Sequence, residues 1–234
     1  MTCDEYMDAL GDDYKTVKLL SKKNGATVIK MRNTRLGRDM ILKKYEVPVP
    51  AYNSLKHIRH DNLPEIYDSI ILSDGQIVLE EYIDGITVAE VLESGRYTYH
   101  GAKEVLSGVC SAAMTLHSLG YIHRDIKPEN IIITTDGRVK LIDLNAARRL
   151  DSEKTKDTVV LGTIGYAAPE QLGISATDER ADIYSIGILL NVMLTGEHPG
   201  KLLAKGRARS IILKCTATAP EARYSTVEKL MRAL

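Results

Sequence analysis

The chain has 234 residues, with 31 basic and 31 acidic side chains and a formal net charge of zero. Its length suits one large domain or two small ones, and its ordinary apolar content excludes an intrinsically disordered chain. A neutral charge balance argues against nucleic acid or an anionic membrane as the main partner. The sequence contains 12 Tyr but neither Phe nor Trp, so tyrosine and aliphatic side chains must supply the large residues of the core.

The three cysteines, Cys3, Cys110 and Cys215, are far apart and odd in number. Neither a disulfide framework nor a clustered metal site fits that spacing, so we expect reduced thiols and a cytoplasmic protein. The acidic N-terminus lacks the basic-then-apolar order of a signal peptide. No apolar run approaches the ~20 residues of a membrane-spanning helix, so we expect no membrane segment in this chain.

Residues 14–82 are predicted to form strands, because short segments rich in β-branched residues alternate there with turn signals. Asn24-Gly25 and Ser73-Asp74-Gly75 mark two hairpin turns. A short helix can occupy part of 51–59, because the two prolines just before it set its earliest start. The predicted strands are Tyr14–Leu20, Thr27–Arg32, Arg38–Lys44, Ile66–Leu72 and Gln76–Tyr82.

Beyond Asp84-Gly85 the apolar periodicity becomes helical. Apolar residues recur at three- and four-residue spacing from Ala102 to Leu116, and Gly120 ends that helix. A strand-rich region followed by a helical one, with a junction near 82–85, is typical of proteins with a ligand cleft. The other predicted elements are a hairpin of Ile131–Thr134 with Val139–Ile142, a helix Asp182–Leu194 ended by Gly196, and a last helix Thr226–Leu234.

The segment with the most chemistry is His123-Arg124-Asp125-Ile126-Lys127-Pro128-Glu129-Asn130. It places one carboxylate, one lysine and one carboxamide on a tight loop, although a polar surface loop is the plain alternative. Phosphoryl transfer needs such a set: a group that orients the attacking hydroxyl, a cation at the moving phosphate, and an oxygen ligand for Mg²⁺. Asp143 follows the second hairpin strand and can share a hard cation with Asn130.

A third segment, Gly162-Thr163-Ile164-Gly165-Tyr166-Ala167-Ala168-Pro169-Glu170, completes a series. H-R-D-x-K-P-x-N, then D-x-x, then G-T-x-G-Y-x-A-P-E resembles the protein kinases, in the style of the bacterial (Hanks-type) serine/threonine kinases. The resemblance runs from about 14 to 234 and implies the two-lobed, α+β kinase fold. It implies one kinase domain, 1–234, with an N-lobe at about 10–82, a hinge at about 81–85 and a C-lobe at about 86–234.

The resemblance implies ATP and Mg²⁺ as cofactors and transfer of the γ-phosphoryl group to Ser/Thr hydroxyls of a protein substrate, with autophosphorylation included. On the family's pattern, which is a general template for phosphoryl transfer, Asp125 matches the catalytic Asp and Lys127 the Lys that contacts the γ-phosphate. Asn130 and Asp143 match the two Mg²⁺ ligands.

Two further features follow from the resemblance. Glu170 matches the Glu of the A-P-E motif, and Arg223 matches its Arg partner. The segment 143–170 matches the activation segment, in which Ser152, Thr155 and Thr158 are candidate phosphorylation sites, with Arg124 as the side chain that would pair with a phosphate. An ordinary exposed loop is the equal alternative there.

In the N-terminal part, Met40-Ile41-Leu42-Lys43 aligns with V-A-I-K and makes Lys43 the strand-three lysine, a third catalytic residue. Lys44 then points to the opposite face of the strand. Leu79–Gly85 resembles the hinge, where the backbone of Glu81 and Ile83 would bind adenine. The full set of expected nucleotide-binding residues is Val28, Ile41, Lys43, Glu80, Glu81, Ile83, Asn130 and Asp143.

The sequence departs from the family's pattern in the phosphate cover, where Ser21, Lys23 and Ala26 occupy the glycine positions. Glycines let backbone amides close over phosphates, so this cover should be stiffer. D-F-G reads Asp143-Leu144-Asn145, in which leucine can pack in place of phenylalanine and Asn145 suits a positive φ. Ile41 replaces a small alanine and narrows the adenine pocket.

The helix after strand three lacks its acidic residue, because the Glu position falls on Ala51 and no Asp or Glu occurs between Val47 and His60. A buried lysine without a counter-charge is costly. We therefore predict that Glu80, at the family's gatekeeper position on the neighbouring strand, pairs with Lys43. Glu46, or Asp143 alone with Glu80 hydrogen-bonded elsewhere, are the alternatives.

Three functions are compatible with these motifs. An active Ser/Thr kinase is favoured by the complete set of C-lobe residues, and a pseudokinase by the altered phosphate cover and the missing helix Glu. A small-molecule kinase is disfavoured by the intact G-T-x-G-Y-x-A-P-E segment, which is a peptide platform in the family. Labelled ATP with Mg²⁺, and Asp125→Asn as control, would separate the first two. The protein substrate, the organism and the oligomeric state cannot be read from the sequence.

Overall fold

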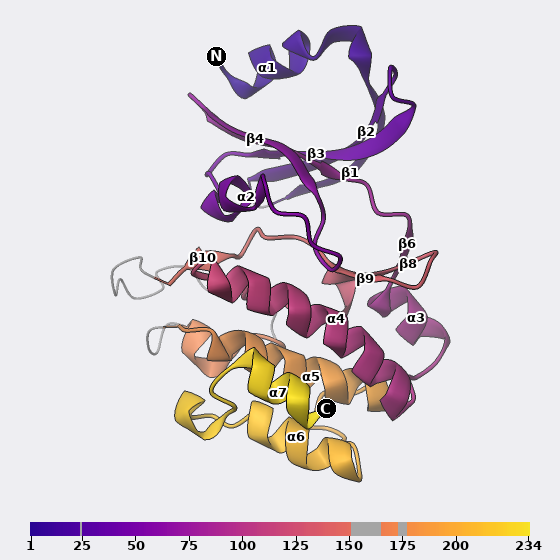
Figure 1. Cartoon of the computed structure of the whole chain (residues 1–234), viewed down its shortest axis with the longest axis vertical. Coiled ribbons are helices and arrows are strands. Elements are labelled where there is room, and N and C mark those ends of the chain that lie inside the picture. The colour runs from indigo at the N-terminus through magenta and orange to yellow at the C-terminus, as the bar shows by residue number, and fades with distance from the viewer. Residues whose placement is uncertain (24, 151–164, 173–176) are drawn as a thin grey trace. The chain divides into compact units, whose positions relative to one another are not determined.

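The computed structural model describes residues 1–23, 25–150, 165–172 and 177–234 (Figure 1). The chain divides into two compact units, the first made of Met1–His60 with Pro64–Ile83 and the second of Asp61–Leu63 with Asp84–Leu234. The first is built on a five-stranded sheet and the second mainly on helices, so the fold is α+β as the motifs imply.

The sheet of the first unit is antiparallel throughout, with the strand order β1-β2-β3-β5-β4. All five predicted strands are confirmed, with ends that differ by up to three residues. Gly75 in the second hairpin turn has φ 157°, and a Cβ there would lie 2.1 Å from the Tyr45 carbonyl oxygen, so only glycine fits. The strands are β1 Tyr14–Lys23, β2 Ala26–Asn33, β3 Arg38–Tyr45, β4 Ile66–Leu72 and β5 Gly75–Glu81.

A helix not predicted from the sequence, α1 (Cys3–Ala9), covers one face of this sheet (Figure 1). Thr2 and Glu5 form a capping box at its start, and the Cys3 backbone N–H donates to Asp74 Oδ1 at 2.7 Å. Lys44 Nζ lies 2.6 Å from Asp4 Oδ1, which confirms that Lys44 points to the face opposite Lys43. The apolar core under α1 consists of Cys3, Met31, Met40, Leu42, Ile77 and Leu79.

The other face of the sheet carries α2 (Pro50–Leu55), a helix shorter than the segment 51–59 in which it was expected. Proline occupies its first turn, where the missing N–H costs nothing. Gln76 is fully buried on β5; its Oε1 accepts from the Val49 backbone N–H at 2.6 Å, and its Nε2 donates to Ser69 Oγ at 2.9 Å. The start of α2 is thereby tied to β4 and β5.

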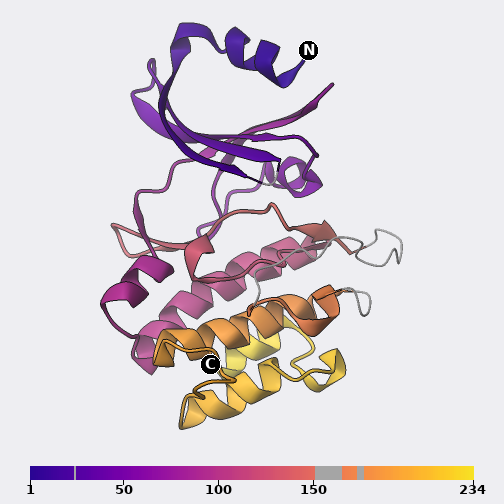
Figure 2. The same cartoon turned by 180° about the vertical axis from the view of Figure 1, so that it is seen from behind.

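The second unit is a stack of helices, in which α5 lies between α4 and α6 (Figures 1 and 2). The apolar helix predicted over 182–194 begins two residues earlier, and Gly196 ends it with φ 77°. Gly187 permits the close contact of α5 with α6, because a Cβ there would lie 2.3 Å from Cys215 Cβ. The helices are α3 Val88–Ser94, α4 Tyr99–Ser118, α5 Arg180–Thr195, α6 Arg207–Cys215 and α7 Val227–Ala233.

Two small sheets pack beside α4 and carry the loops of interest. The predicted hairpin is confirmed, although its second strand ends one residue early, at Leu141. None of the described helices is long and apolar enough to cross a lipid bilayer. The short elements are β6 Gly85–Thr87, β7 Tyr121–Ile122, β8 Ile131–Thr134, β9 Val139–Leu141 and β10 Arg148–Arg149, with 3₁₀ turns at Gly11–Asp13, Pro128–Asn130, Pro169–Leu172 and Pro220–Ala222.

Candidate active site

The loop that carries the predicted catalytic residues is held by a buried carboxylate from α5. Asp182 is fully buried and accepts from the backbone N–H groups of His123 (Oδ2, 3.0 Å) and Arg124 (Oδ1, 2.8 Å). These two bonds fix the backbone just before Asp125, where Arg124 adopts a positive φ of 67°. Burial favours a raised pKa for Asp182, but the hydrogen bond and charge of His117, with His123, hold its pKa below the ordinary value.

Two histidines surround Asp182 in different protonation states. His117 Nε2 donates to Asp182 Oδ2 at 2.8 Å, and its Nδ1 lies 3.5 Å from Glu179 Oε2. Burial opposes the charged form of His117, yet the hydrogen bond and the charges of Asp182, Glu179 and Asp178 raise its pKa above the usual value. Burial lowers the pKa of His123. Its Nε2 donates to the Ile142 carbonyl at 3.2 Å and its Nδ1 accepts from the Asp125 N–H at 3.3 Å, which is the hydrogen-bonding pattern of a neutral ring.

The raised pKa of His117 predicts a pH-dependent contribution to stability. A group whose pKa is higher in the folded state stabilises fully below its unfolded pKa, about 6.5 for histidine, and loses this effect as pH rises through the folded pKa. We therefore expect His117→Gln to lower the melting temperature most at about pH 5.5 and least at about pH 8.5. His100→Gln, a change at an exposed histidine of the same helix, is the control. A His117→Gln deficit that stays constant across this range would contradict the ion pair with Asp182.

The three predicted residues of the catalytic loop form one hydrogen-bonded cluster. Lys127 Nζ lies 2.8 Å from Asp125 Oδ2. Asn130 Nδ2 donates to the same Oδ2 at 2.9 Å and to the Asp125 carbonyl at 2.8 Å. The carboxylate is therefore oriented by a cation and an amide together. Because the amide nitrogen of Asn130 is turned toward Asp125, its carboxamide oxygen is presented on the other side.

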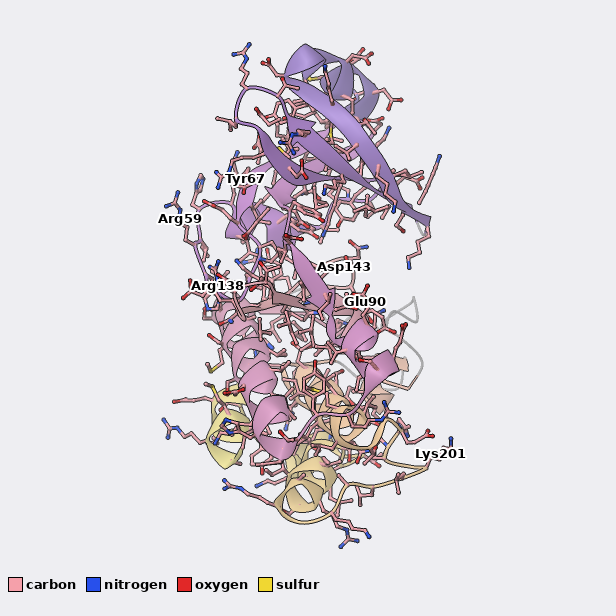
Figure 3. The ribbon with its side chains drawn as sticks, turned by 90° about the vertical axis from the view of Figure 1, so that its right-hand side faces the viewer. Arg59, Tyr67, Glu90, Arg138, Asp143 and Lys201 are labelled. Atoms are coloured by element: carbon pink, nitrogen blue, oxygen red, sulfur yellow. The ribbon has the colours of Figure 1, made fainter. Side chains whose placement is uncertain are left out.

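Asp143, which is labelled in Figure 3, follows shortly after β9, and a backbone hydrogen bond of the preceding residue brings it to the catalytic loop. The Ile142 N–H donates to the Asn130 carbonyl at 2.8 Å. Because Ile142 directly precedes Asp143, this bond connects the backbone segments of the two predicted Mg²⁺ ligands, Asn130 and Asp143. Leu144 is buried, as expected of a residue that replaces phenylalanine. The expected positive φ at Asn145 is wrong: among the described non-glycine residues only Arg124 and Asp143 have positive φ, 67° in each case. The left-handed conformation falls on Asp143 itself, a residue type that tolerates it.

The oxygens of Asn130 and Asp143 fit a hard divalent cation. In the described part of the chain no group of three or more His, Cys, Asp or Glu side chains could hold a metal ion. One carboxylate with one carboxamide is nevertheless the kind of pair that binds Mg²⁺ together with substrate phosphates and water.

The segment that ends in Glu170 is anchored to the loop and to the C-terminal region. Arg223, whose side chain is fully buried, forms a two-pronged ion pair with Glu170 at 2.6 and 2.9 Å, which confirms the predicted partnership. The Tyr184 ring lies under the Arg223 guanidinium, with 5.0 Å between the guanidinium carbon and the ring centre. Gln171, which sequence reasoning missed, donates to the Arg124 carbonyl at 2.9 Å and accepts from the Ala168 N–H at 3.1 Å. The available hint was its position: Gln171 directly follows the A-P-E motif, and an amide that is buried there needs hydrogen-bond partners.

In the first unit, the predicted ion pair is present. Lys43 Nζ lies 2.8 Å from Glu80 Oε1, and the two side chains are only 6% and 5% exposed. Residues Ile41 and Glu80 are directly opposite in the β3–β5 ladder, so Lys43 and Glu80 are diagonal neighbours on one face. The alternative partner Glu46 is exposed after the end of β3. Pairing of Lys43 with Glu80 is therefore confirmed.

The other predicted nucleotide contacts of this unit follow the same sheet. Val28 is directly opposite Lys43 in the β2–β3 ladder, so Val28, Ile41, Lys43 and Glu80 share one face. Glu81 ends β5 and its N–H donates to the Glu65 carbonyl at 2.9 Å. Ile83, half-buried, lies in the irregular segment after β5.

The altered phosphate cover is a two-stranded hairpin, with a register shift between Leu19 and Ser21. Strand β1 continues to Lys23, and Ser21, Lys22 and Lys23 pair with Val28, Thr27 and Ala26. Residues with side chains thus take the place that glycines have in the family. Ser152, Thr155, Thr158 and the segment 162–164 lie outside the described residues.

A cavity of about 600 Å³ lies elsewhere in the second unit, lined by Tyr99, the end of α5 and parts of 202–208. None of its lining residues belongs to a catalytic motif. The clustered acid, lysine and amide of the loop, rather than this cavity, define the candidate active site, because only they can orient and charge-stabilise a reacting group.

Comparison with known proteins agrees with this geometry. The family described as "Protein kinase domain" matches residues 14–232, so the chain belongs to the protein kinase domain family. A probable serine/threonine-protein kinase of Streptomyces coelicolor is 32% identical over 209 residues, which is 81% of this chain and 31% of that protein. The serine/threonine-protein kinase PknB of Mycobacterium tuberculosis is 31% identical over 209 residues, 81% of this chain and 33% of that protein. The chain thus spans about a third of the length of these relatives.

Proposed function

We propose that this chain is an ATP- and Mg²⁺-dependent protein kinase that transfers the γ-phosphoryl group to Ser/Thr hydroxyls of a protein, including its own. The observation that carries the proposal is the Asp125 carboxylate, oriented by Lys127 and Asn130 on a loop whose backbone is held by buried Asp182. Family membership and the names of the relatives as serine/threonine-protein kinases support it. The three described cysteines are buried free thiols, which suits the reducing cytoplasm.

Asp125 is the group that receives the substrate hydroxyl. A carboxylate fixed in one orientation can accept the hydrogen bond of the hydroxyl and take its proton as the oxygen attacks phosphorus. Lys127 Nζ lies 2.8 Å from that carboxylate and would stabilise the charge that develops on the transferred phosphoryl group. Positioning and charge stabilisation are the main requirements of phosphoryl transfer, and these two residues provide both.

Asn130 and Asp143 are the residues that would hold Mg²⁺. When bound, the ion neutralises phosphate charge and helps to orient the reacting group. In the first unit, Lys43 would bind the α- and β-phosphates with Glu80 in the structural role of the absent helix Glu. The backbone of Glu81 and Ile83 would bind adenine, and Val28 and Ile41 would pack against it.

The metal assignment predicts how ATP binding responds to Mg²⁺. In isothermal titration calorimetry, wild-type affinity for ATP should rise on addition of Mg²⁺, because two oxygen ligands and the phosphates share the ion. Asp143→Asn should lose most of that gain but keep its affinity in EDTA. Asp136→Asn, at an exposed turn between β8 and β9, is the matched control. Equal wild-type affinity with Mg²⁺ and with EDTA would overturn the assignment and favour a pseudokinase.

A pseudokinase is the second candidate, and the observation that favours it is that the β1–β2 pairing continues to Lys23, through the family's glycine positions. Side chains at the glycine positions leave fewer backbone amides for phosphates. Incubation with labelled ATP, Mg²⁺ and a basic protein substrate separates the two. Label on Ser or Thr in the wild type and not in Asp125→Asn supports the kinase; ATP binding with no transfer supports the pseudokinase.

A further inference from the structure

Lys43 has a second hydrogen-bond partner in the first unit, and this partner is a tyrosine rather than an acidic residue. Its Nζ lies 2.9 Å from the Tyr52 hydroxyl oxygen, in addition to 2.8 Å from Glu80 Oε1. Because an ammonium group only donates hydrogen bonds, the tyrosine oxygen must accept. The Nζ atom also lies 5.2 Å from the centre of the Tyr52 ring, within reach of a cation–π attraction.

Tyr52 is itself held by a second tyrosine. The hydroxyl oxygens of Tyr45 and Tyr52 are 2.9 Å apart, and their rings stack with centroids 5.6 Å apart. Tyr45 lies two residues after Lys43 on β3, so both side chains point to the same face of the sheet. Both tyrosines are buried, at 3% and 1% exposure. The hydroxyl of Tyr52 therefore belongs to a hydrogen-bonded network with Lys43 and Tyr45.

The helix that carries Tyr52 is fastened to the sheet. Besides its bonds to Val49 and Ser69, Gln76 Nε2 lies 3.4 Å from Asn53 Oδ1, an acceptor on α2 itself. Asn53 Oδ1 also accepts from the hydroxyl of Ser69 on β4. The residue next to Tyr52 is thus bonded to two strands, so the position of Tyr52 over Lys43 is set by the sheet.

We propose that Tyr52 is a positioning residue for Lys43, and that its hydroxyl and Glu80 together replace the carboxylate that the family places on this helix. The proposal rests on the proposed function, in which Lys43 binds the ATP phosphates. Lys43, Glu80 and Tyr45 belong to the sheet, and α2 is tied to it through Gln76. The lysine is therefore oriented by the sheet together with a helix that is hydrogen-bonded to the sheet.

A role in packing alone is the competing explanation. A chain without Phe must fill its core with Tyr, and each buried hydroxyl then needs a partner. If Lys43 merely satisfies the hydroxyl, removing the hydroxyl leaves the behaviour of the lysine unchanged.

The test uses the full chain with Tyr52→Phe, which keeps the ring and its stacking but removes the acceptor. Steady-state kinetics should show kcat/KM for ATP falling about tenfold, as expected for a lost hydrogen bond to a charged group, with KM for the protein substrate unchanged.

Acetylation of Lys43 by acetic anhydride without nucleotide, followed by mass spectrometry, should become faster because the ammonium form has lost an acceptor. Tyr45→Phe should change both measurements in the same direction by less. Tyr67→Phe, at a tyrosine of β4 that is 38% exposed, should change neither.

Wild-type kcat/KM for ATP and wild-type acetylation in Tyr52→Phe would overturn the proposal, even if its melting temperature fell. Should Tyr52→Phe fail to fold, Tyr45→Phe decides by the same two measurements: it removes the hydroxyl that holds the Tyr52 hydroxyl in place, so wild-type values in both would overturn the proposal. If the wild type neither binds ATP nor transfers phosphate, the proposed function fails, while the acetylation comparison still decides whether Tyr52 holds Lys43.

Discussion

Asp125→Asn should reduce kcat for phosphoryl transfer by about 10²- to 10⁴-fold, the usual loss when a positioned general base is removed. Asparagine keeps the shape of the side chain and can still accept from Lys127 and Asn130 through its oxygen, so the loop should keep its conformation. What it cannot do is take the proton of the attacking hydroxyl. KM for ATP should change little, because Asp125 acts on the hydroxyl rather than on the nucleotide.

The measurement is a steady-state assay of phosphate incorporation, with thermal unfolding of the same preparations as the check on folding. Asp136→Asn serves as the matched control, because that aspartate is exposed in a turn and pairs only locally, with Arg138 and Thr134. A kcat for Asp125→Asn within tenfold of the wild type, at equal melting temperature, would remove Asp125 from the catalytic role.

Glu80→Gln should be among the most destabilising single changes in the first unit. Lys43 and Glu80 are almost completely buried, and removing one member of a buried ion pair leaves the other charge in a place of low polarity. Such losses are typically about 3–5 kcal/mol, which for a domain of this size lowers the melting temperature by roughly 6–20 °C. ATP affinity should fall as well, because Lys43 loses one of the two groups that orient it.

Two comparisons sharpen this test. Glu46→Gln, at an exposed position just after the same strand, should alter neither stability nor ATP affinity. The double change Lys43→Met with Glu80→Leu should recover most of the lost stability, since two apolar side chains remove the unpaired charge, but it should not recover ATP binding. A Glu80→Gln protein as stable as the wild type would show that the pair contributes nothing to the fold.

Local signals in the sequence were sufficient for most of the fold. The strands of the first unit and the helix α5 show the two periodicities, and turn residues such as Gly75 and Gly196 mark their ends. The helix α1 was missed because its seven residues are stabilised by contacts distant in sequence, including Asp74 and Lys44. The helix propensity of one short segment does not depend on such distant contacts, so it could not predict this helix.

Within the candidate site, the partnership of Lys43 and Glu80 could be predicted because two neighbouring strands place diagonal residues on one face. Tyr52 could not, since its contact with Lys43 depends on where a six-residue helix is fastened to the sheet. The absence of Phe was the available hint, because buried tyrosines bring hydroxyl groups into the core. The positive φ at Asp143 also escaped prediction, although aspartate is one of the residue types that tolerate it.

The central claim, phosphoryl transfer by this chain to Ser or Thr, is tested most directly by phosphopeptide mass spectrometry. The purified protein is incubated with ATP and Mg²⁺, alone and with a basic protein substrate, beside Asp125→Asn and a sample in EDTA. The predicted result is time-dependent phosphorylation of Ser or Thr residues in the wild type only, with none in EDTA. Phosphorylation that is absent from the wild type, or equal in Asp125→Asn, would contradict the claim.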